Sequence, residues 1–291
     1  MPSPVADRLA QEAQIILEKR ISDNQLNLPP PPTVVMKAMA LLRDPNFTTK
    51  DAASLIERDA VVAARVLRAA NSEQHSGTEQ ARSLPQALTR LGIERLRAVL
   101  VETSAQRLFE SRDQRIVDAT RGLWEHSLGV AILARDVAAL CGVEETEAAY
   151  LSGLLHDIGK PVVAWLLLEA EKSVVGTRTN VWIEPEVWVE VINRVHRPVG
   201  VALAARWGLP ESISDAIRDC NEYNGTDRLS VVNCVRFANA LTKREGLYVG
   251  KFDPSDIDAL VMIGRSLLGI DDHVLSRLSG GLGDRVRMLM S

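Results

Sequence analysis

The chain has 291 residues, with 34 Lys and Arg against 38 Asp and Glu, which leaves a formal net charge of −4. This length excludes a disulfide-stapled mini-protein and corresponds to one large domain or two smaller ones. The negative balance excludes bulk electrostatic attraction to nucleic acid or to an anionic membrane, although it leaves room for a local basic patch. Hydrophobic residues make up 46% of the chain but aromatic residues only 4%, which favours a helical protein over a sheet.

Three cysteines, Cys141, Cys220 and Cys234, have no CxxC spacing. They predict neither a disulfide framework nor a Cys-type zinc site, and they fit a reducing cytoplasm. The N-terminus lacks the basic region and apolar run of a secretory signal, and the longest wholly apolar stretch, Val162–Leu168, is too short to span a bilayer. We therefore expect a cytoplasmic protein with no membrane segment.

Helical periodicity dominates the first third of the chain. An amphipathic helix in residues 1–22 is predicted from an apolar stripe formed by Val5, Leu9, Ala13, Ile16 and Leu17. Pro29–Pro32 ends it and forms a stiff connector, because consecutive prolines prefer extended geometry. Capping signals then predict short helices that begin at Thr33, at Thr48 with Asp51, at Asp59, and at Ser83 with Pro85. Gly92 would end the last of them in a left-handed conformation, which completes an N-terminal helical lobe over residues 23–92.

A longer helix is predicted from Ile93 to about Phe109, and it connects the N-terminal lobe to the rest of the chain. Its arginines could contact phosphate groups. Because Glu94, Glu102 and Glu110 balance them, we favour a solvated face and do not expect a nucleic-acid partner.

Two later helices carry the residues with the most specific chemistry. Leu123–Leu140 is apolar on nearly every face and predicts a buried central helix, on which His126 needs a polar partner. Ala148–Lys160 (AAYLSGLLHDIGK) places His156 beside Asp157. An imidazole nitrogen and a carboxylate oxygen suit Zn, Fe or Mn, so His126, His156 and Asp157 are candidate ligands of a divalent metal. A buried His–Asp–His hydrogen-bond cluster without an ion is the alternative.

These segments carry a family resemblance. Trp124–Ser127 (WEHS) and Gly153–Lys160 (GLLHDIGK) resemble the core of the metal-dependent phosphohydrolases of the HD superfamily. Further landmarks are Leu28–Pro30, Asp44–Pro45, Leu55–Asp59, Arg65–Ser72, Leu88–Gly92, Val199–Gly200 and Trp207–Pro210. They resemble one branch, the HDOD (HD-related output domain) family of bacterial signalling proteins, and the resemblance runs from about residue 20 to about residue 245.

The resemblance implies a metal site that is incomplete. Catalytic branches of the superfamily hold the metal with an H…HD…D set, whereas this chain has Asn239 where the last aspartate is expected, and it has no GYP triplet. An amide oxygen is a poorer ligand than a carboxylate. His196 is either a fourth ligand or phosphate contact, or a partly buried histidine bonded to backbone. Lys160 would face a substrate phosphate in HD hydrolases; a helix C-terminal charge is the alternative.

We therefore predict an all-α protein in which an N-terminal helical lobe packs on an HD-like helical lobe. The predicted parts are an N-terminal helix (1–22), an HDOD domain (23–245, with lobes 23–92 and 93–245) and a C-terminal helical extension (246–291). In the extension, Ser255 with Asp258 is expected to form a capping box, opening a helix along Leu260, Ile263 and Leu267. His75 and His273 are expected to be solvated.

The predicted function is that of a bacterial regulatory module with a degenerate HD metal site and no attached receiver or GGDEF-like segment. It would act through contact with a signalling protein, or by sensing a nucleotide or phosphorylated small molecule. The alternative is a metal-dependent phosphodiesterase that uses His126, His156 and Asp157.

Overall fold

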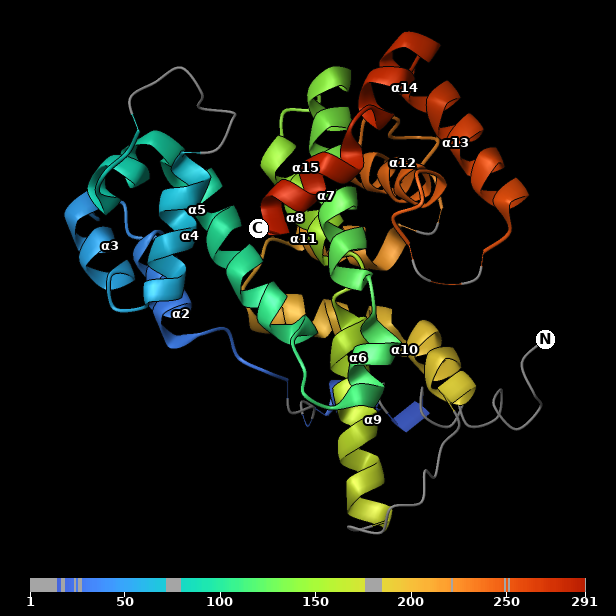
Figure 1. Cartoon of the computed structure of the whole chain (residues 1–291), viewed down its shortest axis with the longest axis horizontal. Helices are drawn as coiled ribbons and strands as arrows, with labels where there is room; N and C mark the ends of the chain where they lie inside the picture. Colours follow the sequence, from blue (N-terminus) through green and yellow to red (C-terminus); the bar gives the residue numbers. More distant parts are fainter. Residues whose placement is uncertain are drawn as a thin grey trace. The chain divides into compact units, whose positions relative to one another are not determined.

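The computed structural model describes residues 28–71, 80–175, 185–220, 222–248 and 252–290, together with 15–16, 19–23, 25 and 250. These residues form helices joined by turns and contain no strand, which confirms the predicted all-α fold (Figure 1). Most of the helix predicted over 1–22, and His75, lie outside the described residues. The chain divides into two compact units, Pro30–Arg107 and Leu108–Ser291 with the segment that ends at Pro29.

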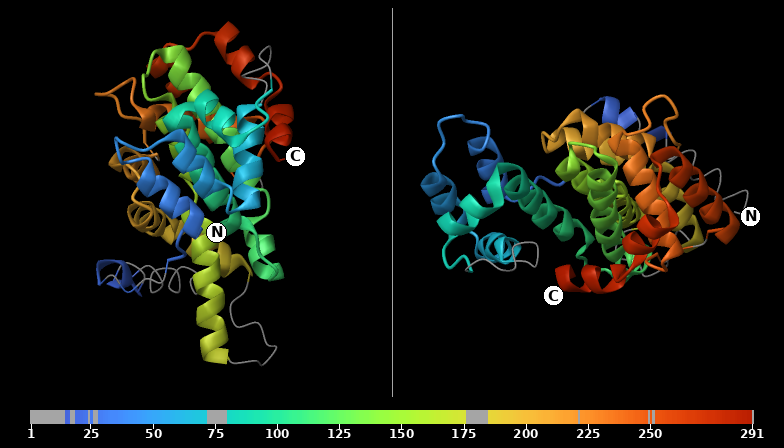
Figure 2. Two further views of the ribbon diagram at one scale, coloured as in Figure 1. Left: turned by 90° about the vertical axis from the view of Figure 1, so that its left-hand side faces the viewer. Right: turned by 90° about the horizontal axis from the view of Figure 1, so that it is seen from above.

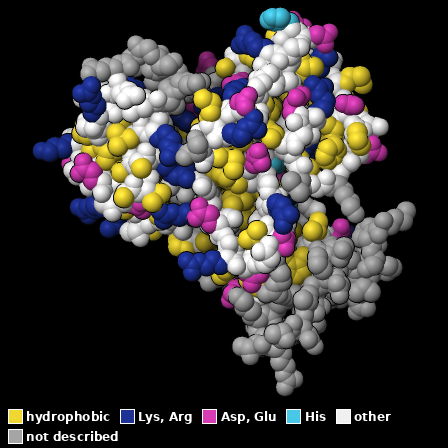
Figure 3. All heavy atoms as spheres, in the orientation of Figure 1, with side chains coloured by type: hydrophobic (Ala, Val, Ile, Leu, Met, Phe, Trp, Pro, Cys, Tyr) yellow, Lys and Arg dark blue, Asp and Glu magenta, His cyan; other side chains and the backbone are white. Residues whose placement is uncertain are grey.

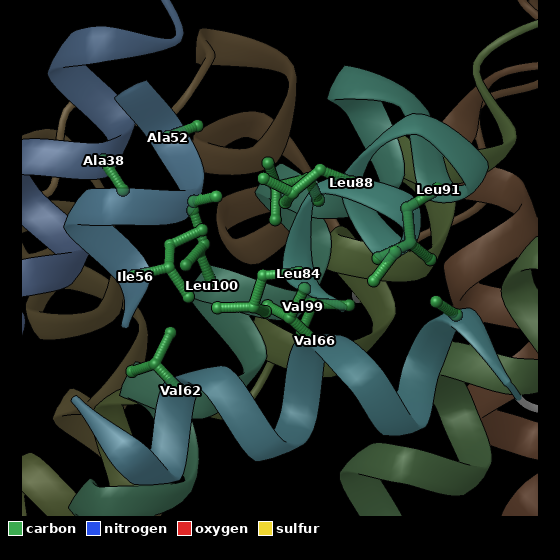
Figure 4. Packing of buried hydrophobic residues seen from close by; sticks show 14 of the residues in the cluster. Ala38, Ala52, Ile56, Val62, Val66, Leu84, Leu88, Leu91, Val99 and Leu100 are labelled. Carbon is green, nitrogen blue, oxygen red and sulfur yellow. The ribbon is translucent and has the colours of Figure 1, made fainter. Parts of the chain in front are cut away.

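The first unit is a small helical bundle around one apolar core. Its helices are α2 (Thr33–Leu41), α3 (Thr49–Ile56), α4 (Ala60–Ala70) and most of α5 (Leu84–Phe109). Side chains from all four helices meet in the cluster drawn in Figure 4, where Ile56, Val62 and Leu100 are completely buried. The helix expected to connect the lobes from Ile93 onward therefore belongs to this unit as far as Arg107.

Most helix boundaries of this unit follow the predicted signals. Thr48 and Asp51 form the capping box, and Asp59 accepts hydrogen bonds from the first turn of α4. Gly92, at φ 70°, interrupts α5 as predicted. The expected Thr33 cap is wrong, because α2 begins directly at Thr33 and Pro32 occupies the position before it without a side-chain hydrogen bond.

The second unit is built around α7. Its helices are α6 (Gln114–Thr120), α7 (Leu123–Cys141), α8 (Thr146–Leu155), α9 (Gly159–Val175), α10 (Pro185–Arg206), α11 (Glu211–Asp219), α12 (Val231–Arg244), α13 (Pro254–Leu268), α14 (Asp272–Ser279) and α15 (Leu282–Met290). Helices α8, α12, α14 and α15 pack against α7, whose residues are mostly buried. The prediction of a buried central helix is confirmed.

Two glycines set how closely the helices approach. A Cβ on Gly153 of α8 would lie 2.9 Å from the Val130 carbonyl oxygen of α7. A Cβ on Gly159, the first residue of α9, would collide with the backbone carbonyl of His196 in α10. The turn that separates α8 from α9 is therefore held against α7 on one side and against α10 on the other.

One stretch of the described chain, Thr146–Glu169, has the length and the mean hydropathy (1.3) of a membrane-crossing segment. In the structure, 83% of its apolar window is buried inside the protein, and the stretch is divided into α8 and the first part of α9. It therefore behaves as a pair of core helices. Two further views show the second half of α9 extending away from the other helices of its unit (Figure 2).

The C-terminal helices differ in detail from the expectation. Asp253, not Ser255, caps α13, because Pro254 suits the first helical position and the Asp253 side chain accepts from the Ser255 amide. The buried face of α13 is Ile257, Val261, Gly264 and Leu268 rather than the predicted stripe. Gly264 decides between the two faces, because only a glycine allows the close approach to Tyr223 and Phe237.

The surface agrees with the mixed charge of the sequence. On the face drawn in Figure 3, Lys and Arg side chains are scattered among acidic and apolar ones, and the described residues visible there form no continuous basic patch. Cys141, Cys220 and Cys234 are all free thiols, which confirms the absence of disulfides among them.

Candidate metal centre

The second unit brings the predicted histidines and aspartate together. His156 and Asp157 lie in the turn between α8 and α9, and His126 lies in the first turn of α7. The potential ligand atoms of His126, His156 and Asp157 all lie within 4.8 Å of one another, and all three residues are buried. The two imidazole rings meet edge to face, with centroids 5.3 Å apart.

The hydrogen bonds of the histidines fix their tautomers. Nδ1 of His126 lies 2.8 Å from the Leu247 carbonyl oxygen, Nδ1 of His156 lies 2.7 Å from that of Gly153, and Nδ1 of His196 lies 2.8 Å from that of Asn193. A carbonyl oxygen only accepts, so each Nδ1 must carry the proton and donate it. In the neutral ring, Nε2 is then a free lone pair, which is the atom that a metal requires.

Among the described residues, none of these three Nε2 atoms has a hydrogen-bond partner, although all are buried. Nε2 of His156 lies 3.4 Å from Oδ2 of Asp157, and Nε2 of His196 lies 3.3 Å from Oδ1. At this distance each Nε2 lone pair and the carboxylate oxygen that it faces repel one another, unless a proton or a cation lies between them. The donor set therefore fits a divalent metal.

Asp157 is the centre of this cluster. Burial by itself would raise the pKa of Asp157, but the neighbouring His156 ring and the Lys160 ammonium outweigh it and hold the pKa well below its usual range. The Lys160 ammonium lies 2.6 Å from Oδ2. Burial lowers the pKa of Lys160, yet Asp157 more than compensates and the pKa is raised.

Lys160 therefore forms a buried ion pair. Its reading as a helix C-terminal charge is wrong, since it is the second residue of α9 and the helix dipole there disfavours a cation. The ion pair with Asp157 compensates for this unfavourable effect of the helix dipole on Lys160. Its contact with a substrate phosphate stays a prediction.

His126 is neutral over the physiological range. Complete burial, and after it the proximity of His156, lowers the pKa of His126 from 6.5 to about 3. A ring that resists protonation keeps its Nε2 lone pair available to a cation, which is the state that a ligand needs.

Two further predicted residues lie on neighbouring helices. His196 of α10 reaches the opposite oxygen of Asp157 from His156. Asn239 of α12 is buried, and its Oδ1 has no hydrogen-bond partner in the part of the chain that the structure describes. Helix α12, which carries Asn239, packs on both α7 and α8. Whether these five residues act as ligands stays a prediction.

Sequence reasoning missed the segment that follows α12. Besides the Leu247 carbonyl, the ring of Tyr248 meets the His126 ring at a centroid distance of 5.0 Å, and Lys243 Nζ lies 4.8 Å from the Tyr248 ring centroid. A backbone carbonyl leaves no sequence signal. A tyrosine five residues after a lysine, in a chain with only 3 tyrosines, was the one available hint.

Comparison with known proteins supplies the wider context. The HDOD domain matches residues 28–223, which is about two thirds of the chain. An uncharacterized protein of Treponema pallidum (strain Nichols) is 26% identical over 204 residues, or 69% of this chain. The chain spans only 39% of the length of that relative.

Two solved structures have the same fold. A Shewanella amazonensis SB2B protein, provisionally named a metal-dependent phosphohydrolase, is 19% identical with a TM-score of 0.78, and the match covers 97% of this chain and 99% of that one. A Marinobacter aquaeolei VT8 protein, provisionally named a signal transduction protein, is 20% identical with a TM-score of 0.64, and the match covers 97% and 65% of the two chains. The match over residues 28–223 contains His126, His156, Asp157 and His196. Because it covers more than half of the chain, the chain belongs to the HDOD domain family.

Proposed function

We propose that this protein is a regulatory module of bacterial signal transduction that binds one divalent metal ion, Fe, Mn or Zn, at His126, His156 and Asp157. Its HDOD family membership and the name of the Marinobacter structure support the signalling assignment. One observation carries the metal assignment: the buried histidines donate through Nδ1 to backbone carbonyls and leave Nε2 unpartnered around one carboxylate. The name of the Shewanella protein supports the same kind of site.

We favour regulation over hydrolysis for two reasons. Asn239 replaces the fourth carboxylate and cannot supply negative charge to orient a metal-bound water. Lys160 already occupies Oδ2 of Asp157. The signal would then pass through contact with a signalling protein or through a phosphorylated ligand. The cytoplasm suits this activity, and the three free thiols support that location.

Metal analysis of the purified protein tests the proposal. After reconstitution, we expect about one ion per chain in the wild type and less than about a tenth of that in His126→Ala and in His156→Ala, because each loses one of few ligands. His273→Ala is the matched control, since His273 is exposed on α14. A wild-type chain that stays empty with Fe, Mn and Zn would overturn the metal assignment.

Activity measurement separates the two functions. We expect no phosphodiesterase turnover by the metal-loaded wild type above that of metal-free protein. Turnover that disappears in His156→Ala but persists in His273→Ala would replace the regulatory assignment with that of a phosphohydrolase.

A further inference from the structure

Lys243, in the last turn of α12, carries a half-buried ammonium group that no carboxylate neutralises. Among the described residues it makes no ion pair, and its contact is the Tyr248 ring. Burial lowers the pKa of Lys243, and the charges of Lys160 and Arg236 lower it further against the opposing effect of Asp157. A half-buried charge without a counter-charge is unfavourable, so this position favours a bound anion.

The local charges show which kind of anion fits. The Lys160 ammonium is already paired with Asp157 at 2.6 Å, and it lies 5.9 Å from the Tyr248 ring centroid. The ammonium groups of Lys243 and Lys160 thus both lie near the Tyr248 ring, and the nearby Asp157 carboxylate is paired with Lys160. The remaining positive charge, which a metal ion at the His–Asp cluster would increase, attracts a dianion more strongly than a monoanion.

Tyr248 gives the Lys243 ammonium a fixed neighbour. The Tyr248 ring contacts the rings of His126 at 5.0 Å and Phe252 at 5.9 Å. A Cβ on Gly250 would lie 2.5 Å from its Cε1, so the Gly250 backbone lies against the ring. Within the described chain the Tyr248 hydroxyl makes no hydrogen bond, which leaves an O–H donor for a ligand.

We propose that Lys243 and Tyr248 bind a phosphate group, as free phosphate or as the monoester of a small molecule, beside the His–Asp cluster. The ammonium supplies charge, and the hydroxyl supplies a hydrogen bond to a phosphate oxygen. Both residues lie beyond residue 223, the last residue matched by the HDOD domain. The inference does not rest on metal occupancy, because its starting observation is that no carboxylate among the described residues pairs with Lys243.

Calorimetric titration of the full chain tests this site, with inorganic phosphate in one arm and glycerol 3-phosphate in the other. Lys243→Met keeps most of the side-chain volume and removes the charge, and it should weaken phosphate binding by about tenfold or more. Lys243→Arg should retain binding. Lys37→Met is the matched control, because Lys37 is exposed on α2, and it should bind like the wild type.

The outcomes discriminate. Tighter binding of the ester assigns the site to a phosphorylated small molecule, and equal or weaker binding assigns it to free phosphate. If neither titrates into the wild type, or if Lys243→Met binds as tightly, the proposal is overturned. Tyr248→Leu, which leaves α12 intact, tests the site independently and should also weaken binding. Metal content measured on the same samples should not change in Lys243→Met, so failure of the metal assignment is distinguishable from failure of this one.

Discussion

At the scale of single residues, the candidate centre is defined by which histidine nitrogen points inward. His126, His156 and His196 come from two helices and a turn, yet each donates Nδ1 to a carbonyl and each buries an unpartnered Nε2. The residue types could be predicted from the sequence, because a histidine on an all-apolar helix and an adjacent His–Asp pair are specific signals. Their orientation could not, since two of the carbonyl partners are set by helix geometry and the third by a distant loop.

The buried state of His126 predicts a pH dependence of stability. Its pKa is about 3 in the folded protein and 6.5 in the unfolded chain. As the pH falls, His126 of the unfolded chain therefore binds a proton before His126 of the folded protein does. The contribution of His126 to the free energy of unfolding is complete above about pH 6.5 and is lost on acidification toward pH 3. For metal-free protein, we expect this residue to contribute a slope of up to about 1.4 kcal/mol per pH unit between about pH 6 and 4, measured by denaturant titration.

His126→Gln should flatten this slope, whereas His273→Gln, at an exposed position, should keep it. Asp157 does not interfere, because its pKa is lowered from 3.8 and its contribution is lost only below that value. Equal slopes in the wild type and in His126→Gln would contradict the assignment.

At the scale of helices, local signals predicted boundaries well where the chemistry is local. The Thr48–Asp51 box and the Asp59 cap each need only four consecutive residues to form, and both are present. The prediction of a Ser255–Asp258 box was wrong because Asp253 caps the same helix end. The prediction of the buried face of α13 was wrong for another reason, since contact with α12 and Tyr223 selected one of two apolar stripes. The hydrophobic periodicity of a sequence does not show against which other helix a face packs.

The contact between α9 and α10 yields a second prediction. Gly159→Ala should destabilise the protein by about 1–3 kcal/mol, because the new methyl group collides with the His196 carbonyl and the helices must separate. The shift should also lower metal content, since His196 and Asp157 move apart. Gly225→Ala is the matched control, because nothing lies within 4 Å of its Cβ position. Thermal and denaturant unfolding measure the difference, and equal effects of the two substitutions would disprove the constraint.

At the scale of the whole chain, the second unit is larger than the family match. Helix α12 lies beyond residue 223 and packs on α7 and α8, with Val235, Phe237 and Leu241 completely buried. The all-α class and the family could be predicted from spaced motifs. The predicted domain, which ends at residue 245, already included α12; the packing of the helices that follow it could not be predicted, because those residues carry no motif.

This extent predicts the behaviour of a shortened chain. A fragment of residues 28–223 should not fold cooperatively, since loss of three buried side chains worth about 2–5 kcal/mol each exceeds much of a typical stability of about 5–15 kcal/mol. It should bind a hydrophobic dye and show no sharp melting transition, whereas a fragment of residues 28–290 should melt cooperatively. A sharp transition in the shorter fragment would show that α12 is dispensable.

The bond between His126 and the Leu247 carbonyl spans 121 positions of sequence and is made by the main chain of residue 247. Its integrity therefore depends on loop length rather than on side-chain identity. Position 247 can change during evolution without altering the bond, so long as the turn at Gly246 keeps its φ of 81°. An insertion or deletion of one residue between Gly246 and Tyr248 would instead displace the carbonyl and release the ring of His126. Related chains should thus vary in residue type here while keeping the spacing from α12 constant.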